Sequence, residues 1–120
     1  MVEKHSWEKV ELEQLNPLIS RRMLSGAQST IARVYLKRGA IVPRHSHINE
    51  QITMIWGGAL KLIFDDGEVV LRTGELLLIP SGVPHAAEAL EDTDDMDVFI
   101  PRRQDWIDKD DAYLRESAKK

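Results

Sequence analysis

Three of the four histidines, together with one glutamine, have the types and the spacing of a metal site. His45 and His47 are two residues apart in a stretch of extended character, and alternate residues of an extended chain point to the same side. Gln51 has the same parity four residues further on, and His85 follows a rigid turn at residues 80–84 that sets the direction of the next strand. Three imidazoles and one amide oxygen suit one divalent first-row transition metal: zinc, nickel, iron, manganese or copper.

The residues alone leave two alternatives open. The histidines could instead be surface or core side chains that are satisfied by other partners. Glu50 is a rival oxygen ligand, but its parity is opposite to that of His45 and His47, so we favour Gln51. His5 lies near the N-terminus and is set aside.

The elements that must position these residues are short strands separated by frequent turns. We expect strands at about residues 30–37, 51–56, 60–64, 68–71, 75–79, 85–90 and 96–100. The sequence Asp65-Asp66-Gly67 predicts a hairpin between two of them, because glycine supplies the positive φ that the turn requires. We interpret the acidic run Glu91–Asp95 as a solvated turn, and we expect some helix around residues 110–116. Many short strands at close spacing predict an all-β sandwich or barrel.

Length and composition restrict the class of protein. The chain of 120 residues predicts a single domain, with a barrel core at about 20–101 and a tail at 102–120. With no cysteine it has no disulfide and no thiolate ligand. No apolar run approaches the roughly 20 residues of a membrane helix, and no signal pattern begins the chain, so we expect a cytoplasmic protein without a membrane partner. A net charge of −4 without a basic stripe argues against a nucleic-acid partner.

Two spaced motifs resemble those of the cupin superfamily. Their positions are Gly39, His45, His47, Gln51 and Gly58 in the first half, and Gly74, Pro80, Gly82 and His85 in the second. The resemblance implies a double-stranded β-helix, or jelly-roll barrel, with one metal held inside by the three histidines and Gln51. Gln51 stands where the first motif usually has Glu, and Ala89 stands where the second usually has Asn. A neutral ligand at position 51 should favour an anionic substrate and lower the metal affinity somewhat.

A narrower resemblance covers about residues 20–107. The segment Asp97–Trp106 is similar to the D-V-F-x-P-x-R-x-D-W ending of the KdgF-type pectin-degradation cupins, and residues 47–51 and 84–93 are similar to the same family. Such proteins open the ring of 4,5-unsaturated monouronates to give the linear 4-deoxy-5-keto uronate. The resemblance implies a metal-dependent isomerase on a small sugar acid, in which Asp97, Phe99 and Arg103 line the pocket.

The chemistry of these residues fits that role. Asp97 could move a proton during ring opening, and Arg103 offers a planar fork that matches a carboxylate. We therefore expect Asp97 and Arg103 to be catalytic, with Arg103 and Phe99 binding the substrate. The structural alternative is that Asp97 only pairs with Arg103 and braces the tail. We expect Trp106 to be a packing anchor rather than a platform for the sugar.

Two rival functions and an oligomeric state complete the expectations. One rival is a non-catalytic cupin that binds a sugar acid as a sensor or carrier, and the other is a metal-dependent cupin dioxygenase. We also expect a homodimer, because Ile52, Met54 and Trp56 share the face of their strand that is opposite to the metal side. The alternative is that another segment of the same chain covers this face.

Overall fold

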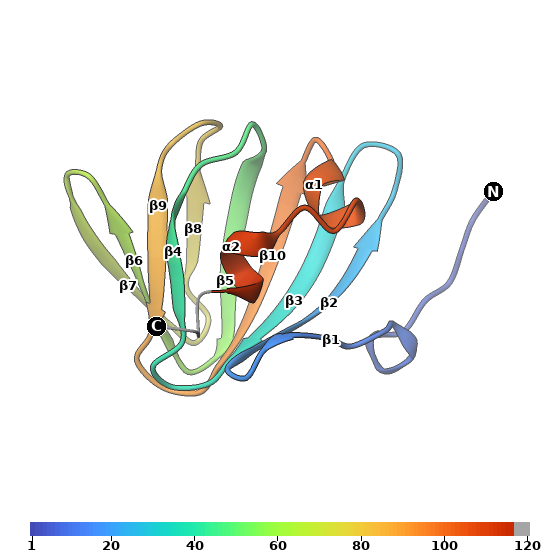
Figure 1. Cartoon of the computed structure of the whole chain (residues 1–120). Helices are drawn as coiled ribbons and strands as arrows, with labels where there is room; N and C mark the ends of the chain where they lie inside the picture. The colour runs from blue at the N-terminus through green and yellow to red at the C-terminus, as the bar shows by residue number, and fades with distance from the viewer. Residues whose placement is uncertain (117–120) are drawn as a thin grey trace.

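The computed structural model describes residues 1–116, and over this range it contains two antiparallel sheets packed face to face (Figure 1). The larger sheet has the strand order β1 (Glu13–Asn16), β2 (Ile19–Ser25), β3 (Thr30–Leu36), β10 (Thr93–Ile100), β5 (Glu50–Gly57) and β8 (Leu76–Ile79). The smaller sheet has the order β4 (Ile41–His45), β9 (His85–Ala89), β6 (Ala59–Phe64) and β7 (Gly67–Arg72). The predicted all-β jelly roll is confirmed.

The local patterns that predicted strands correspond to β3 and to β5 through β10. The hairpin is also confirmed: Phe64 pairs with Gly67 across the turn, and the φ of Gly67 is 151°. The sequence did not predict β1, β2 and β4. In β2 the charged pair Arg21 and Arg22 interrupts the apolar pattern, and β4 contains Pro43 and an irregular register between Val42 and His45. The larger sheet therefore begins at residue 13, ahead of the expected start of the barrel.

The interpretation of residues 91–95 as a solvated turn holds only for Glu91 and Asp92, which are exposed, and is wrong for the other three residues. β10 begins at Thr93, and Thr93 and Asp95 are 5% and 4% exposed. Thr93 is satisfied inside because its hydroxyl donates to the carbonyl of Ala59 at 3.1 Å. Inward positions in this strand are polar as well as apolar, so the acidic composition hid a regular period of two.

The core lies between the inward faces of the two sheets. Its apolar side chains come from both of them and include Val34, Leu36, Ile55, Leu60, Leu62, Ala87 and Phe99. Full burial of one such large apolar side chain contributes about 1.5–3 kcal/mol relative to exposure. This shared core holds the two sheets, and hence the ends of β4, β5, β9 and β10, in one arrangement.

The tail has the partly helical character that its sequence predicts. It contains α1 (Gln104–Ile107) and α2 (Ala112–Arg115), while residues 117–120 lie outside the described range. α2 packs against β1 and β4, which are edge strands of the two sheets (Figure 1). A short helix, η1 (Trp7–Lys9), precedes β1. Within the described residues, no helix has the length and apolar character needed to cross a membrane.

The outer face of β5 is apolar, as the alternation predicts. Ile52 and Trp56 are 37% and 52% exposed, so neither the N-terminal segment nor the described part of the tail buries them. Leu78 and Leu76 of β8 pair with Ile52 and Met54 and are also exposed. The larger sheet therefore carries an apolar outer surface formed by Ile52, Met54, Trp56, Leu76 and Leu78.

Candidate metal centre

The fold brings three histidines together from separate segments. His45 ends β4 and is the cross-strand partner of His85, the first residue of β9. His47 lies in the connection between β4 and β5 rather than in a strand. The three rings are 4.3–5.5 Å apart between centroids, and one ligand atom from each lies within 4.8 Å of the others. These three side chains can form a metal site.

Backbone carbonyls orient all three imidazoles. The Nδ1 atoms lie against carbonyl oxygens two residues away: Pro43 O at 2.8 Å from His45, Val83 O at 2.8 Å from His85, and Asn49 O at 3.1 Å from His47. A carbonyl can only accept, so each Nδ1 carries the hydrogen and each Nε2 presents a lone pair. This is the arrangement that metal-binding histidines require. Nε2 of His85 is buried and has no partner among the described residues.

Burial also keeps these imidazoles neutral. It lowers the pKa of His45 to about 4 and the pKa of His47 to about 4, and it lowers the pKa of His85. The positive charge of Arg103 acts in the same direction on all three. At neutral pH the histidines are therefore unprotonated, as ligation demands.

Gln51 lies beside the histidines, whereas Glu50 is exposed and points away from the interior. The Gln51 amide nitrogen donates to the hydroxyl of Thr53 at 2.8 Å, which directs Oε1 to within 3.1 Å of Nε2 of His47. Three imidazole nitrogens and an amide oxygen are ligands for a divalent first-row metal. The residues present therefore fit such a cation.

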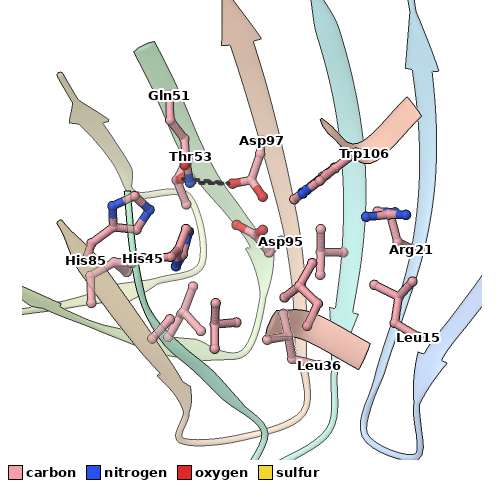
Figure 2. Close-up of a pocket in the computed structure, with 16 residues that line it drawn as sticks. Leu15, Arg21, Leu36, His45, Gln51, Thr53, His85, Asp95, Asp97 and Trp106 are labelled. Carbon is pink, nitrogen blue, oxygen red and sulfur yellow. Dashed lines mark hydrogen bonds between the residues drawn. The ribbon is translucent and has the colours of Figure 1, made fainter. Parts of the chain in front are cut away.

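Two buried carboxyl groups on β10 adjoin this cluster (Figure 2). Asp97 accepts a hydrogen bond from the Thr53 hydroxyl at 2.8 Å and a longer one from the Gln51 amide at 3.4 Å. Burial raises the pKa of Asp97, and burial together with the negative charge of Asp97 raises the pKa of Asp95 well above its usual range. Of these two carboxyl groups, Asp95 is therefore the one that is more readily protonated.

Arg103 reaches the same region from the tail but does not pair with Asp97. Its Nε and Nη2 atoms donate to Asp105 at 2.9 and 2.8 Å, and its guanidinium stacks on the rings of Phe99 and Trp106 at 4.7 and 4.1 Å. The alternative of an Asp97–Arg103 brace is wrong. Asp105 occupies the Nε and Nη2 edge of the guanidinium. Among the described residues no hydrogen bond uses Nη1, which is therefore available to a ligand.

Aromatic side chains pack against the histidine cluster and against one another. Phe99 is 1% exposed and packs edge-on against His47, with ring centroids 5.8 Å apart, and also against Trp106. Trp106 is 4% exposed and donates its indole N–H to the hydroxyl of Tyr113. Its contacts are those of a packing anchor.

The cluster opens onto a cavity of about 60 Å³ (Figure 2). His45, His85, Gln51, Asp95 and Asp97 line one part of it. Leu36, Trp106 and Leu114 are among its apolar lining. At about 10–15 Å³ for each water, this volume corresponds to roughly four to six water molecules.

Sequence reasoning missed two residues of this region. Asp95 shares the parity of Asp97 and Phe99, which could have identified it had the acidic run not been interpreted as a turn. Tyr113 packs on His45, with ring centroids 4.7 Å apart, although the two are 68 positions apart in the chain. No local pattern in the sequence signals that contact.

Comparisons with known proteins agree with this geometry. Residues 32–100 match the Cupin_2 family, described as a cupin domain. The pectin degradation protein KdgF of Dickeya dadantii (strain 3937) is 26% identical over 98 residues, which are 79% of this chain and 89% of that protein. The structure of KdgF from Halomonas sp. superposes with a TM-score of 0.77 at 27% identity, covering 82% of this chain and 94% of that one. An RmlC-like cupin from Shewanella frigidimarina NCIMB 400 has the same fold, with a TM-score of 0.81, 23% identity, and 88% and 96% coverage.

Proposed function

Because the chain belongs to the Cupin_2 family of cupin domains, we propose that it is a metal-dependent enzyme that opens the ring of a 4,5-unsaturated monouronate. The product would be the linear 4-deoxy-5-keto uronate. The likeness to the pectin degradation protein KdgF, in sequence and in structure, supports a role in pectin breakdown. The sugar acid would come from pectin or alginate that a lyase has already cleaved.

One residue carries this proposal, because Gln51 joins the candidate metal ligands to a buried acid. Its Oε1 atom lies 3.1 Å from His47, and its Nε2 atom lies 3.4 Å from Asp97. A proton-transfer group thus lies one side chain away from the position where a substrate oxygen would be polarised. Histidines with only a structural role would not need a side chain that links them to a buried acid.

The metal would be held by Nε2 of His45, His47 and His85, with Gln51 as the oxygen ligand. When bound, the cation supplies Lewis-acid polarisation of a substrate oxygen. All four protein ligands are neutral, so the charge of the cation is not offset by its ligands. A site of this kind favours an anionic substrate such as a uronate.

The protein side chains divide the remaining work. Asp97 is a buried carboxylate with a raised pKa, which brings its proton affinity nearer to the working pH and suits proton transfer. Arg103 presents Nη1 to the substrate carboxylate while Asp105 fixes the orientation of its guanidinium. Phe99 supports both groups through its contacts with His47 and Arg103.

Turnover of lyase-generated unsaturated monouronates tests the proposal. The substrate double bond absorbs ultraviolet light, so opening and conversion of the ring should remove the absorbance. The metal-loaded protein should accelerate this loss, and the chelated protein should not. Binding of the uronate without any acceleration would instead support the second candidate, a sugar-acid carrier or sensor.

We also propose that the protein is a homodimer in which the apolar outer surface of β5 and β8 meets a second copy. Its exposed side chains, Ile52, Trp56, Leu76 and Leu78, form a contiguous patch on one sheet. Large apolar patches of this kind are typical of protein interfaces. The cytoplasmic location and the absence of a nucleic-acid partner stay predictions.

A further inference from the structure

The second helix of the tail lies outside the part of the chain that matches the cupin family. The match ends at residue 100, whereas α2 spans Ala112–Arg115. α2 packs against β1 and β4, which are edge strands of different sheets. Side chains hold it there: the Asn16 amide donates to the carbonyl of Leu114 at 2.6 Å, and Arg21 pairs with Asp111 at 2.8 Å.

Tyr113 is the residue of α2 that reaches the candidate metal centre. Its ring lies against that of His45 at 4.7 Å, with an angle of 30° between the planes. Its hydroxyl oxygen accepts hydrogen bonds from Nη2 of Arg103 and from the indole N–H of Trp106, both at 3.1 Å. Tyr113 therefore contacts both His45, a candidate metal ligand, and Arg103, the cationic residue of the site.

The Tyr113 hydroxyl accepts two hydrogen bonds but donates none to the described residues. Both contacts use the oxygen as an acceptor, and among residues 1–116 no acceptor takes its proton. A phenol with a pKa near 10 keeps that proton at neutral pH. Beside it, Arg103 retains Nη1 as a further donor. Two adjacent N–H and O–H donors without acceptors form a subsite for an anion such as a carboxylate.

Space also directs a ligand toward α2. The cavity of about 60 Å³ is far smaller than the roughly 300–1,000 Å³ of typical small-molecule sites. A sugar acid must therefore widen the site or lie across its rim. α2 contributes Leu114 to the lining of this cavity and therefore borders the space that a larger ligand needs. Tyr113 is not part of the cavity lining, but it packs on His45, which is, so a ligand that extends past His45 comes next to Tyr113.

We propose that Tyr113 is a substrate-binding residue, whose hydroxyl and Nη1 of Arg103 together bind the carboxylate of the sugar acid. The identity of the ligand as a sugar acid rests on the proposed function. The chain would thus supply part of its substrate specificity from a segment beyond the family match.

The test compares metal-loaded wild type, Tyr113→Phe and Tyr35→Phe. Tyr35 is the other tyrosine of the chain and lies on the outward face of β3, away from the cavity. Calorimetric titration with D-galacturonate, a saturated uronate, should give a dissociation constant about tenfold to a hundredfold higher for Tyr113→Phe, because one hydrogen bond to a carboxylate is lost. Tyr35→Phe should bind as the wild type does.

Two further readouts exclude a merely structural effect. Metal content should be unchanged in Tyr113→Phe, although its melting temperature should fall because the buried indole N–H of Trp106 loses its acceptor. The methyl ester of galacturonate should bind wild type and Tyr113→Phe equally, because it lacks the charge. KM for the unsaturated uronate should rise with the dissociation constant, while kcat changes less. Equal or tighter binding of galacturonate by Tyr113→Phe would overturn the inference.

The outcome for the proposed function is separate. A wild type that binds galacturonate but leaves unsaturated uronates unchanged refutes the ring-opening activity alone, and the Tyr113→Phe ratio still decides the inference. Turnover with the same KM in wild type and Tyr113→Phe refutes the inference alone. A wild type that neither binds nor converts any uronate refutes both.

Discussion

The Oε1 atom of Gln51 lies 3.1 Å from Nε2 of His47, and both atoms are acceptors. The amide is oriented by its donation to Thr53, and Nδ1 of His47 faces the carbonyl of Asn49. With the hydrogen on Nδ1, two lone pairs face each other in a partly buried site. A cation between them would turn this repulsion into coordination, which is why the pair argues for a metal more strongly than the histidine cluster alone.

The first prediction concerns metal content. Protein purified without a histidine tag should contain close to one divalent metal per chain, measured by elemental analysis. His47→Ala should lose most of it, because the site loses one nitrogen ligand and the partner of Gln51. His5→Ala is the matched control, since His5 lies outside the cluster, and it should retain the metal. Full metal content in His47→Ala would remove His47 from the ligand set.

The second prediction concerns proton transfer. Asp97→Asn preserves the shape of the side chain but removes its basicity, so kcat should fall by about 10²- to 10⁴-fold. Metal content and melting temperature should stay close to those of the wild type. Asp66→Asn, in an exposed turn, is the control and should have normal kinetics. Wild-type turnover by a folded, metal-loaded Asp97→Asn protein would end the catalytic role of Asp97.

The third prediction concerns recognition of the carboxylate. Arg103→Ala should raise KM by about tenfold to a hundredfold, since a charged hydrogen bond is worth roughly 1.5–3 kcal/mol. Arg103→Lys should recover only part of the loss, because an ammonium cannot bind Asp105 and a ligand in the same fork geometry. Arg102 is the exposed neighbour of Arg103, so Arg102→Ala is the control and should have unchanged steady-state kinetics. A melting temperature that falls in step with activity would indicate a structural role instead.

The fourth prediction concerns the pH dependence of the metal-free protein. The folded pKa of His45 and of His47 is about 4, below the value of about 6.5 in an unfolded chain. Between these values the unfolded chain binds protons that the folded chain does not. Acidification from pH 6.5 to about 4 should therefore lower the free energy of unfolding, and stability from this source should be complete above pH 6.5.

Urea unfolding of the chelated protein at several pH values measures this effect. The raised pKa of Asp95 and of Asp97 acts with the opposite sign, because folding there favours proton uptake. The difference between wild type and the double variant His45→Gln, His47→Gln isolates the histidines. The double variant should lose less stability on acidification, and parallel curves would contradict the assignment.

The fifth prediction concerns the oligomeric state. Light scattering at micromolar concentration should give the mass of a dimer. Leu78→Glu places a charge in the centre of the apolar surface of β5 and β8 and should yield monomers. Val70→Glu is the control, because Val70 is similarly exposed but lies in β7 of the other sheet. A wild-type protein that is monomeric under these conditions would exclude the dimer.

Local spacing was sufficient to predict much of this protein. The period of two and the glycine and proline turns predicted an all-β sandwich or barrel, because strand pairing and turn geometry depend on near neighbours. The resemblance to the cupin motifs narrowed this to a jelly roll. The same parity separated buried Gln51 from exposed Glu50, since both lie in one strand. His45, His47 and His85 were assigned as ligands from two short motifs, and the fold does bring them together.

Only the tertiary structure decided the partners of the charged residues. Arg103 binds Asp105 and Tyr113 rather than Asp97, and Asp95 is buried in the interior rather than solvated in a turn. Tyr113 reaches His45 because α2 folds back over the edges of both sheets. Such contacts depend on how packed elements meet in space. A sequence specifies them through the summed burial of many side chains and not through any local period, so no short pattern could have identified them.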